Sequence, residues 1–230
     1  MTAFGRAMMD SVHDGPKRFS MTMVNNGHTI SMDCGDFLTC RQDEKHILES
    51  IDLPQYARVL DYGCGIGRHL SFVRQRHADV QCIGIESCDL LREYCGDAIP
   101  QPSAFYDRWG DIPNGERSFD MILLIGNGLG ILGNENNARR ELKTLVDALR
   151  PQGRIIIETG NPFGTGYFSA AFTIEYQQWR DGPFTWGYSD RDWINLTLSN
   201  LDCTVDILNS KAPGGKFFFA VGKSPNKPSQ

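Results

Sequence analysis

The sequence predicts an α/β protein with a doubly wound, mostly parallel, seven-stranded sheet. From Arg58 onward, short apolar runs alternate with segments of helical periodicity, which is the order of strands and helices in such a fold. The last two apolar runs, 203–208 and 217–221, are joined by a loop that contains Pro213-Gly214-Gly215. This short connection favours an antiparallel C-terminal pair of strands beside a parallel sheet.

The chain before Arg58 begins with a hairpin pattern. Residues 19–33 alternate apolar and polar side chains on either side of Asn26-Gly27, a dipeptide that favours the tight turn of a β-hairpin. The hairpin precedes the sheet, so we expect it to fold over one edge or over a ligand site.

The central elements follow in order. The first of the five expected parallel strands is the apolar run Val59-Leu60, which leads into Asp61, and the others are 80–86, 103–109, 119–126 and 154–159. Asn134 caps the helix before the fifth strand, and Pro151 and Gly153 end it. Residues 161–190 carry nine aromatic side chains without clear periodicity, and this predicts an aromatic cap insertion. Residues 1–223 are expected to form a single domain and 224–230 a disordered tail.

The composition is that of a soluble globular protein, with 40% hydrophobic and 22% charged residues. The net charge of −5 disfavours nucleic acid as the main partner. Seven cysteines without a C-x-x-C pair indicate reduced thiols and a cytoplasmic location. No segment has the length of a membrane span. A small molecule is the expected partner, and the sequence does not decide whether the protein forms a homodimer.

The segment from Asp61 to His69 is the most specific motif in the chain. An apolar strand runs into Asp61, then into glycines at alternate positions, and then into a helix. Glycines at such a turn let the backbone approach a ligand. A dinucleotide site has the spacing G-x-G-x-x-G, whereas here the third glycine comes one residue early and Arg68 stands in its place.

This D-x-G-x-G-x-G form resembles motif I of the class I S-adenosylmethionine-dependent methyltransferases. The resemblance implies a Rossmann-like fold, methyl transfer, and S-adenosyl-L-methionine as the cofactor. Glu86 ends the second strand, where a carboxylate can accept the ribose hydroxyls. Asp111 resembles the acid that such enzymes place near the adenine. The expected cofactor-binding residues are Asp61, Gly63, Gly65, Gly67, Glu86, Asp111, Ile112 and Asn127. No metal site is expected.

The loop after the fourth strand, 126–133, lacks the Asn/Asp-Pro-Pro-aromatic pattern of enzymes that methylate adenine or glutamine nitrogens, so those activities are disfavoured. Asn127 contacts either the cofactor or the acceptor in this interpretation. The candidate bases are His28, at the hairpin tip, His69 and Glu158. A structural role is the alternative for each histidine.

We therefore predict a methyltransferase for a small aromatic or apolar acceptor. The hairpin and the aromatic segment are expected to roof its pocket, with Trp109, Trp179 and Trp186 as walls. The alternatives are a methyltransferase for protein or RNA, a non-catalytic methyltransferase-like subunit and, more remotely, a nicotinamide dehydrogenase. The sequence leaves open whether oxygen, nitrogen or carbon is methylated.

Overall fold

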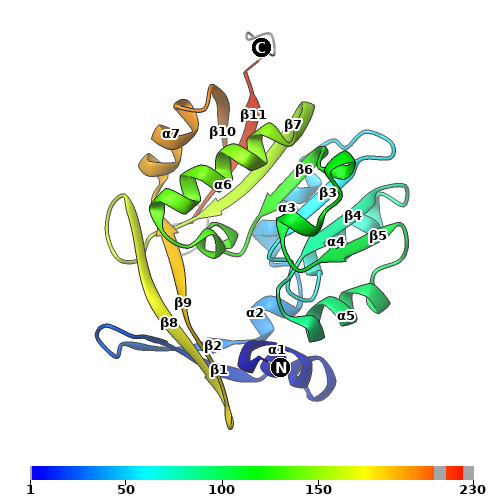
Figure 1. Cartoon of the computed structure of the whole chain (residues 1–230). Helices are drawn as coiled ribbons and strands as arrows, with labels where there is room; N and C mark the ends of the chain where they lie inside the picture. The colour runs from blue at the N-terminus through cyan, green and yellow to red at the C-terminus, as the bar shows by residue number, and fades with distance from the viewer. Residues whose placement is uncertain (1, 210–215, 225–230) are drawn as a thin grey trace.

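The computed structural model describes residues 2–209 and 216–224. Its centre is a seven-stranded sheet with the strand order β10-β11-β7-β6-β3-β4-β5 (Figure 1). The strands are β3 (Arg58–Tyr62), β4 (Gln81–Ile85), β5 (Ser103–Tyr106), β6 (Phe119–Leu124), β7 (Leu149–Thr159), β10 (Cys203–Asn209) and β11 (Phe217–Lys223). The strands β3 to β7 are parallel to one another, and β11 is antiparallel to both of its neighbours. The predicted fold class is therefore confirmed.

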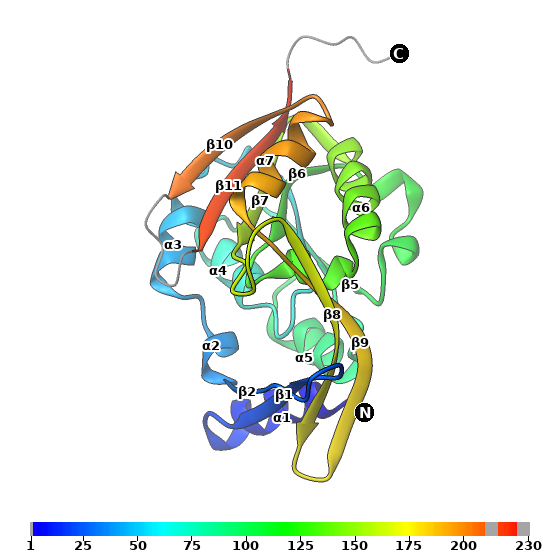
Figure 2. The same cartoon turned by 90° about the vertical axis from the view of Figure 1, so that its left-hand side faces the viewer.

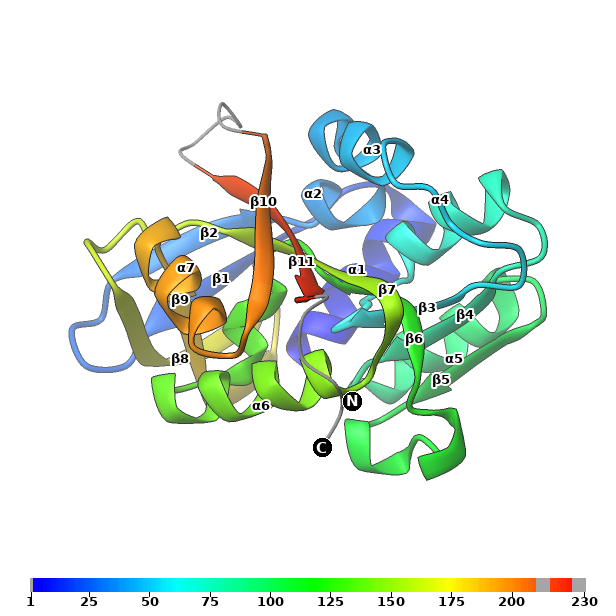
Figure 3. The same ribbon diagram turned by 90° about the horizontal axis from the view of Figure 1, so that it is seen from above.

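Helices cover both faces of this sheet, as seen from above in Figure 3. On one face lie α3 (Gln42–Glu49), α4 (Arg68–Arg76) and α5 (Asp89–Ala98), and on the other lie α6 (Glu135–Asp147) and α7 (Arg191–Ser199). Each face has its own apolar core. Strand residues alternate between them, so that Leu60 packs toward α6 and α7 while Val59 packs toward α3 and α4. Burial on both faces explains why these strands are almost continuously apolar.

A second, four-stranded sheet crosses below the central one (Figure 2). It joins the N-terminal hairpin, β1 (Arg18–Met23) and β2 (Thr29–Asp33), to β8 (Tyr167–Tyr176) and β9 (Trp179–Ser189) in the order β2-β1-β8-β9. We call it the accessory sheet. The hairpin was predicted, but the aromatic segment is regular where the sequence indicated no period. Its two long strands alternate, with Phe172, Ile174 and Tyr176 on the buried face.

The helix α1 (Ala3–Asp14), which the sequence did not reveal, packs against the accessory sheet. Asp181 of β9 accepts hydrogen bonds from the backbone N–H groups of Ala3 at 2.7 Å and Phe4 at 2.9 Å. Apolar residues of α1, the accessory sheet and the start of α5 form a third core, which includes Met8, Phe172 and Leu91. This core attaches the accessory sheet to the central one.

Several boundaries differ from the prediction. The third strand ends at Tyr106, and the short helices η1 (Trp109–Asp111) and η2 (Asn114–Glu116) follow it. The fourth strand ends at Leu124, and η3 (Gly128–Leu132) follows. A short helix, α2 (Gly35–Leu38), connects the accessory sheet to α3. The predicted loop 213–215 lies outside the described residues, as does all of the predicted tail except Ser224. None of the described helices is long and apolar enough to span a membrane.

Candidate cofactor loop and acceptor cavity

The glycine loop between β3 and α4 has the backbone that only glycine adopts easily. Gly63, Gly65 and Gly67 have φ angles of +80°, +57° and +76°. A Cβ at Gly63 would overlap Ile131 of η3, and one at Gly67 would overlap Ile99, the residue directly after α5. A Cβ at Gly65, in contrast, would meet no atom within 4 Å. Of the three, only Gly65 borders open space, and the helix N-terminus that follows favours negative charge there.

Glu86 holds this loop in place. Its carboxylate is buried and accepts hydrogen bonds from the N–H of Gly65 at 3.0 Å and of Cys88 at 2.8 Å. Burial raises the pKa of Glu86, and the two amides offset part of this rise. The structure thus brings Glu86 and Gly65 together at the carboxyl ends of β3 and β4, where open α/β sheets bind ligands.

Asp111 and Ile112, which were predicted to lie near the adenine, do not lie together at this edge of the sheet. Asp111 is exposed and pairs with Arg108 at 3.2 Å, whereas Ile112 is 1% exposed and belongs to the core of the central sheet. Asp107, which the sequence analysis missed, is the first residue after β5. Its carboxylate lies 3.7 Å from Arg92, whose guanidinium also donates to the backbone carbonyl of Glu86 at 2.5 Å. Asp107 is therefore closer to the glycine-loop edge by its contacts than Asp111 is.

Asn127 lies in the loop between β6 and η3, with a φ angle of +60°. Its Nδ2 donates to the carbonyl of Gly187 at 3.4 Å, while its buried Oδ1 has no hydrogen-bond partner in the described part of the chain. An unsatisfied buried acceptor costs about 1–3 kcal/mol. Left-handed backbone and an unpaired amide oxygen are both costs that functional sites commonly carry.

A cavity of about 610 Å³ lies between the loop of Asn127, the end of β7 and the accessory sheet. Its floor is formed by the residues after β6 and β7, and its roof by apolar and aromatic side chains of the accessory sheet. The roof residues are Phe19, Met21, Met32, Ile174, Phe184, Trp186 and Tyr188. Trp186 is the only one of the three predicted tryptophan walls among the described lining residues, since Trp109 packs on Phe119 and Trp179 belongs to the third core.

Glu158 lies at the end of β7 and lines this cavity. Its side chain is 1% exposed, and Oε1 lies 2.7 Å from both Arg41 and Lys216. Oε2 accepts a hydrogen bond from the N–H of Gly126 at 2.5 Å. Both carboxylate oxygens are therefore already engaged, one by two cations and the other by an amide. Its contacts favour a role in fixing the loop that carries Asn127.

His69 lies beneath the glycine loop and does not line the cavity. It is 4% exposed, is absent from the described cavity lining, and its Nδ1 lies 3.0 Å from Asp61. Burial lowers the pKa of His69, but Asp61 and Glu44 outweigh burial and raise it above its ordinary value. Asp61 is 1% exposed and pairs with His69, so its contacts are with the base of the glycine loop.

The hairpin turn keeps His28 exposed, and the described lining of the cavity does not include it. The alternating register points the buried side chains of β1 inward, while the turn between β1 and β2 extends into solvent. His28 is therefore omitted from the proposal below.

Cys40, Glu44 and His69 are the described residues that come nearest to a metal site, with ligand atoms within 4.8 Å of one another. The Glu44 oxygen involved is already held by Arg41 at 2.9 Å and Arg68 at 2.7 Å. Burial raises the pKa of Cys40 to about 12, so the thiol keeps its proton at neutral pH. These contacts describe a buried ion-pair network.

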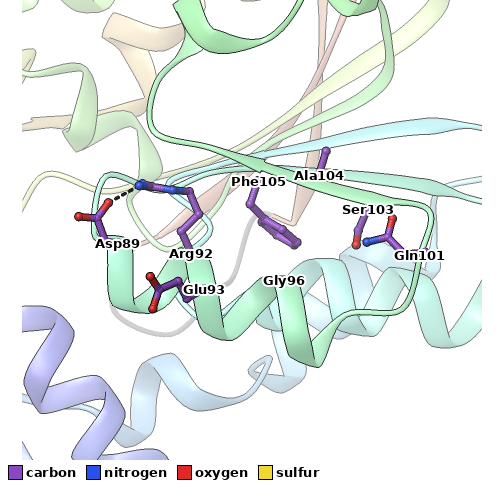
Figure 4. A pocket seen from close by; sticks show the side chains of 8 residues that line it. All are labelled: Asp89, Arg92, Glu93, Gly96, Gln101, Ser103, Ala104 and Phe105. Atoms are coloured by element: carbon purple, nitrogen blue, oxygen red, sulfur yellow. Dashed lines mark hydrogen bonds and ion pairs between the residues drawn. The ribbon is translucent and has the colours of Figure 1, made fainter.

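A second depression, of about 460 Å³, lies between α5 and the edge strand β5 (Figure 4). Figure 4 shows Arg92 reaching toward Asp89, with the ring of Phe105 on the other side of Arg92. It is open to solvent and none of the glycine-loop residues lines it. The cavity under the accessory sheet is the better candidate because polar groups from five separate segments converge there.

Sequence analysis missed the basic groups of this cavity. Arg41, Arg68 and Lys216 line it together with Asp36 of α2, and they come from segments far apart in the chain. Of these four, only Arg68 had a sequence signal, since it follows the glycine motif. The convergence of Asp36 and Arg41 depends on how α2 and the start of α3 lie against β7, and that of Lys216 on the pairing of β11 with β7.

Comparison with known proteins decides the class of enzyme. Residues 59–153, which run from β3 into β7, match the family model described as a methyltransferase domain. This segment contains the glycine loop, Glu86 and the loop of Asn127. It is a methyltransferase domain. The methyltransferase resembles no curated protein closely enough in sequence to give a match.

The solved structures that resemble this methyltransferase share its fold. An S-adenosylmethionine-dependent methyltransferase from Bacteroides fragilis, in complex with S-adenosyl-L-homocysteine, has a TM-score of 0.77 and 18% identity, with 96% of this chain and 94% of that chain covered. The amino pentose methyltransferase CalS10 from Micromonospora echinaspora has a TM-score of 0.56 and 16% identity, with 78% and 88% covered. The sugar N-methyltransferase KedS8 from Streptoalloteichus has a TM-score of 0.59 and 14% identity, with 82% and 89% covered.

These findings confirm the predicted class I S-adenosylmethionine-dependent methyltransferase, both in its fold and in its domain family. The match to a methyltransferase domain likewise supports the prediction of an enzyme. The similar structures from Bacteroides fragilis and Micromonospora echinaspora contain S-adenosyl-L-homocysteine and S-adenosylmethionine.

Proposed function

We propose that this methyltransferase methylates a small, apolar or aromatic acceptor held in the cavity under the accessory sheet. The observation that carries the proposal is the roof itself. The seven roof side chains, together with Phe4, Phe37 and the loops after β6 and β7, enclose about 610 Å³, a volume typical of small-molecule sites. A protein or RNA acceptor needs an open approach, and the net charge of −5 gives RNA little attraction.

The glycine loop fits the cofactor. The open space at Gly65 allows a ligand to lie against the backbone, and the buried carboxylate of Glu86 stands beside it as an acceptor for ribose hydroxyls. We assign Gly63, Gly65, Gly67 and Glu86 to this site, with Asp107 added and Asp111 and Ile112 removed. When bound, S-adenosyl-L-methionine supplies a methyl group already activated by its sulfonium.

The chain's own task is then to orient the acceptor and to exclude water. Orientation alone is worth roughly 7–11 kcal/mol in favourable cases. Glu158 fixes the N–H of Gly126, and Asn127 follows directly in the floor of the cavity. We therefore assign Glu158 a positioning role, and Asn127 a contact with the bound molecules.

Two further observations support this proposal. The similar proteins CalS10 and KedS8 are described as methyltransferases of an amino pentose and of a sugar, both of which are small molecules. All seven cysteines of the chain are free thiols, which favours a reducing cytoplasm as its location.

The test is thermal unfolding with S-adenosylmethionine, S-adenosylhomocysteine or NAD. A ligand at about 100 times its Kd adds roughly 2.7 kcal/mol, which raises the Tm of a domain this size by about 5–10 °C. We expect this shift with both adenosyl ligands and none with NAD.

Gly65→Val should abolish the shift, because the side chain would fill the space beside the backbone. Gly27→Val is the matched control: its φ of +69° and open surroundings impose the same strain at the exposed hairpin turn. An unchanged ligand shift in Gly65→Val, or no shift in the natural sequence, would contradict the proposed cofactor site.

A further inference from the structure

The charged side chains that line the cavity differ in whether they already have an ion-pair partner. Arg41 is paired with Glu44 and Glu158, and Lys216 is paired with Glu158 at 2.7 Å. Arg68 is paired with Glu44 at 2.7 Å. Among the described lining residues, every cation therefore already has a carboxylate partner.

Asp36 is the exception to this pairing. It lines the cavity from α2 and is exposed, and within the described chain its carboxylate forms no hydrogen bond or ion pair. Trp186 and Tyr188 contribute only neutral polar groups. Asp36 is thus the one charged group of the described lining without an ion-pair partner, and its free carboxylate offers a contact to a positively charged group of a bound molecule.

Three aromatic rings line the same cavity as this carboxylate. Phe37 follows Asp36 in the chain, and its ring centroid lies 6.0 Å from that of Phe4 and 6.2 Å from that of Phe19. Phe4 and Phe19 are 5.5 Å apart, and all three rings line the cavity. Aromatic groups beside a carboxylate are the chemistry that proteins use to recognise ammonium ions.

This end of the cavity also lies near the loop of Asn127. The guanidinium of Arg68 donates to the backbone carbonyl of Asp36, and a Cβ at Gly126 would lie 3.1 Å from the same guanidinium. Asp36 and the loop after β6 are therefore bridged by one side chain. The unpaired Oδ1 of Asn127 in that loop is a further acceptor that an N–H group would satisfy.

We propose that the acceptor is a small apolar amine, which enters the cavity as an ammonium ion and is positioned by Asp36 and the cluster of Phe4, Phe19 and Phe37. The inference rests on the proposed function and specifies nitrogen as the methylated atom. The ammonium first gives up a proton to the unpaired carboxylate of Asp36. The nitrogen lone pair then forms the N–C bond as the C–S bond of the methyl donor breaks and its electron pair stays on sulfur.

The experiment uses three probes with the same apolar body: phenethylamine, 2-phenylethanol and phenylacetate. Each is titrated into the full chain saturated with S-adenosylhomocysteine, and Kd is measured by calorimetry. We expect phenethylamine to bind most tightly and, with S-adenosylmethionine, to be methylated on nitrogen. Failure of S-adenosylhomocysteine itself to bind would instead count against the proposed function.

Asp36→Asn should raise the Kd and the KM for phenethylamine about 10-fold or more, because a charged contact is lost, and should leave the Kd of 2-phenylethanol unchanged. Asp52→Asn removes the same charge from an exposed loop outside the cavity and should change neither value. Preference for phenylacetate or the alcohol, no binding of the amine, or an equal effect of Asp36→Asn on amine and alcohol would overturn the inference.

Discussion

Glu86 illustrates how one residue serves the fold and the ligand together. Its two carboxylate oxygens accept the N–H groups of Gly65 and Cys88, so it shapes the glycine loop before any cofactor is bound. Each oxygen retains a second lone pair that can accept a ribose hydroxyl. The same carboxylate therefore connects loop geometry to cofactor affinity.

This arrangement predicts a pH dependence of binding. Burial raises the pKa of Glu86 above its ordinary 4.5 in the free protein, while hydroxyl donors from a ligand would favour the ionised form. Binding should then release protons, and the affinity for S-adenosylhomocysteine should fall as the pH drops through the raised pKa of Glu86. Calorimetry across this range, in buffers of different ionisation enthalpy, measures both effects.

Glu86→Gln should remove the pH dependence and weaken binding by roughly 1.5–3 kcal/mol. Glu49→Gln changes an exposed carboxylate on α3 and serves as the control. Proton release that persists in Glu86→Gln would assign the titration to another group.

The stability of the fold depends on pH in the opposite direction to the affinity for the ligand. Because the pKa of Glu86 is raised on folding, its contribution to stability is present below the unfolded pKa and is lost as the pH rises through the folded value.

At the scale of elements, the contact between the start of α3 and the end of β7 organises the site. Arg41 lies just before α3 and reaches Glu158 in β7 at 2.7 Å, while Glu44 of α3 binds both Arg41 and Arg68. One ion-pair network thus joins α3, α4 and β7 beneath the cavity. Removing one partner leaves buried charge without compensation.

We expect Arg41→Met to reduce the free energy of unfolding by roughly 1.5–3 kcal/mol, because Glu158 is buried and keeps only Lys216 and one amide. Adding Glu158→Gln should recover part of this loss, giving a coupling energy within about 0.5–3 kcal/mol in a double-mutant cycle measured by urea unfolding.

The exposed pair of Arg76 and Glu49, at 3.2 Å, is the control for this cycle, and Arg76→Met should cost less than about 1 kcal/mol. Strict additivity of Arg41→Met and Glu158→Gln would show that the pair contributes no coupling.

At the scale of the whole molecule, the accessory sheet is not an independent unit. Its strands come from two separate segments, 18–33 and 167–189, and the second is inserted between β7 and α7 of the central sheet. The third core packs it on α1 and on the start of α5. A sheet whose strands enter and leave the central fold in this way depends on it for stability.

We therefore predict one cooperative unfolding transition for both sheets. Trp179 and Trp186 report on the accessory sheet, and Trp109 and Trp193 on the central core. Fluorescence of variants that retain one pair of tryptophans, with the others changed to Phe, should give the same urea midpoint as circular dichroism. Separate midpoints would divide the predicted single domain 1–223 into two.

Local patterns determined the central sheet and the glycine loop, because both depend on interactions between neighbouring residues. Parallel strands buried on both faces appear as apolar runs, and a turn with positive φ angles appears as glycines. The Asn26-Gly27 turn predicted the hairpin of β1 and β2 for the same reason. Family resemblance then supplied the chemistry of the loop.

Tertiary structure alone decided which groups share the cavity. Nothing near Arg41 or Lys216 in the chain indicates that both meet Glu158, since these contacts span 117 residues for Arg41 and 58 for Lys216. The same holds for His69, which looked accessible from the motif but is buried against Asp61, and for Asp36, whose lack of a counterion is a property of its surroundings. Local sequence encodes backbone conformation, whereas pairing, burial and uncompensated charge arise only when distant segments pack.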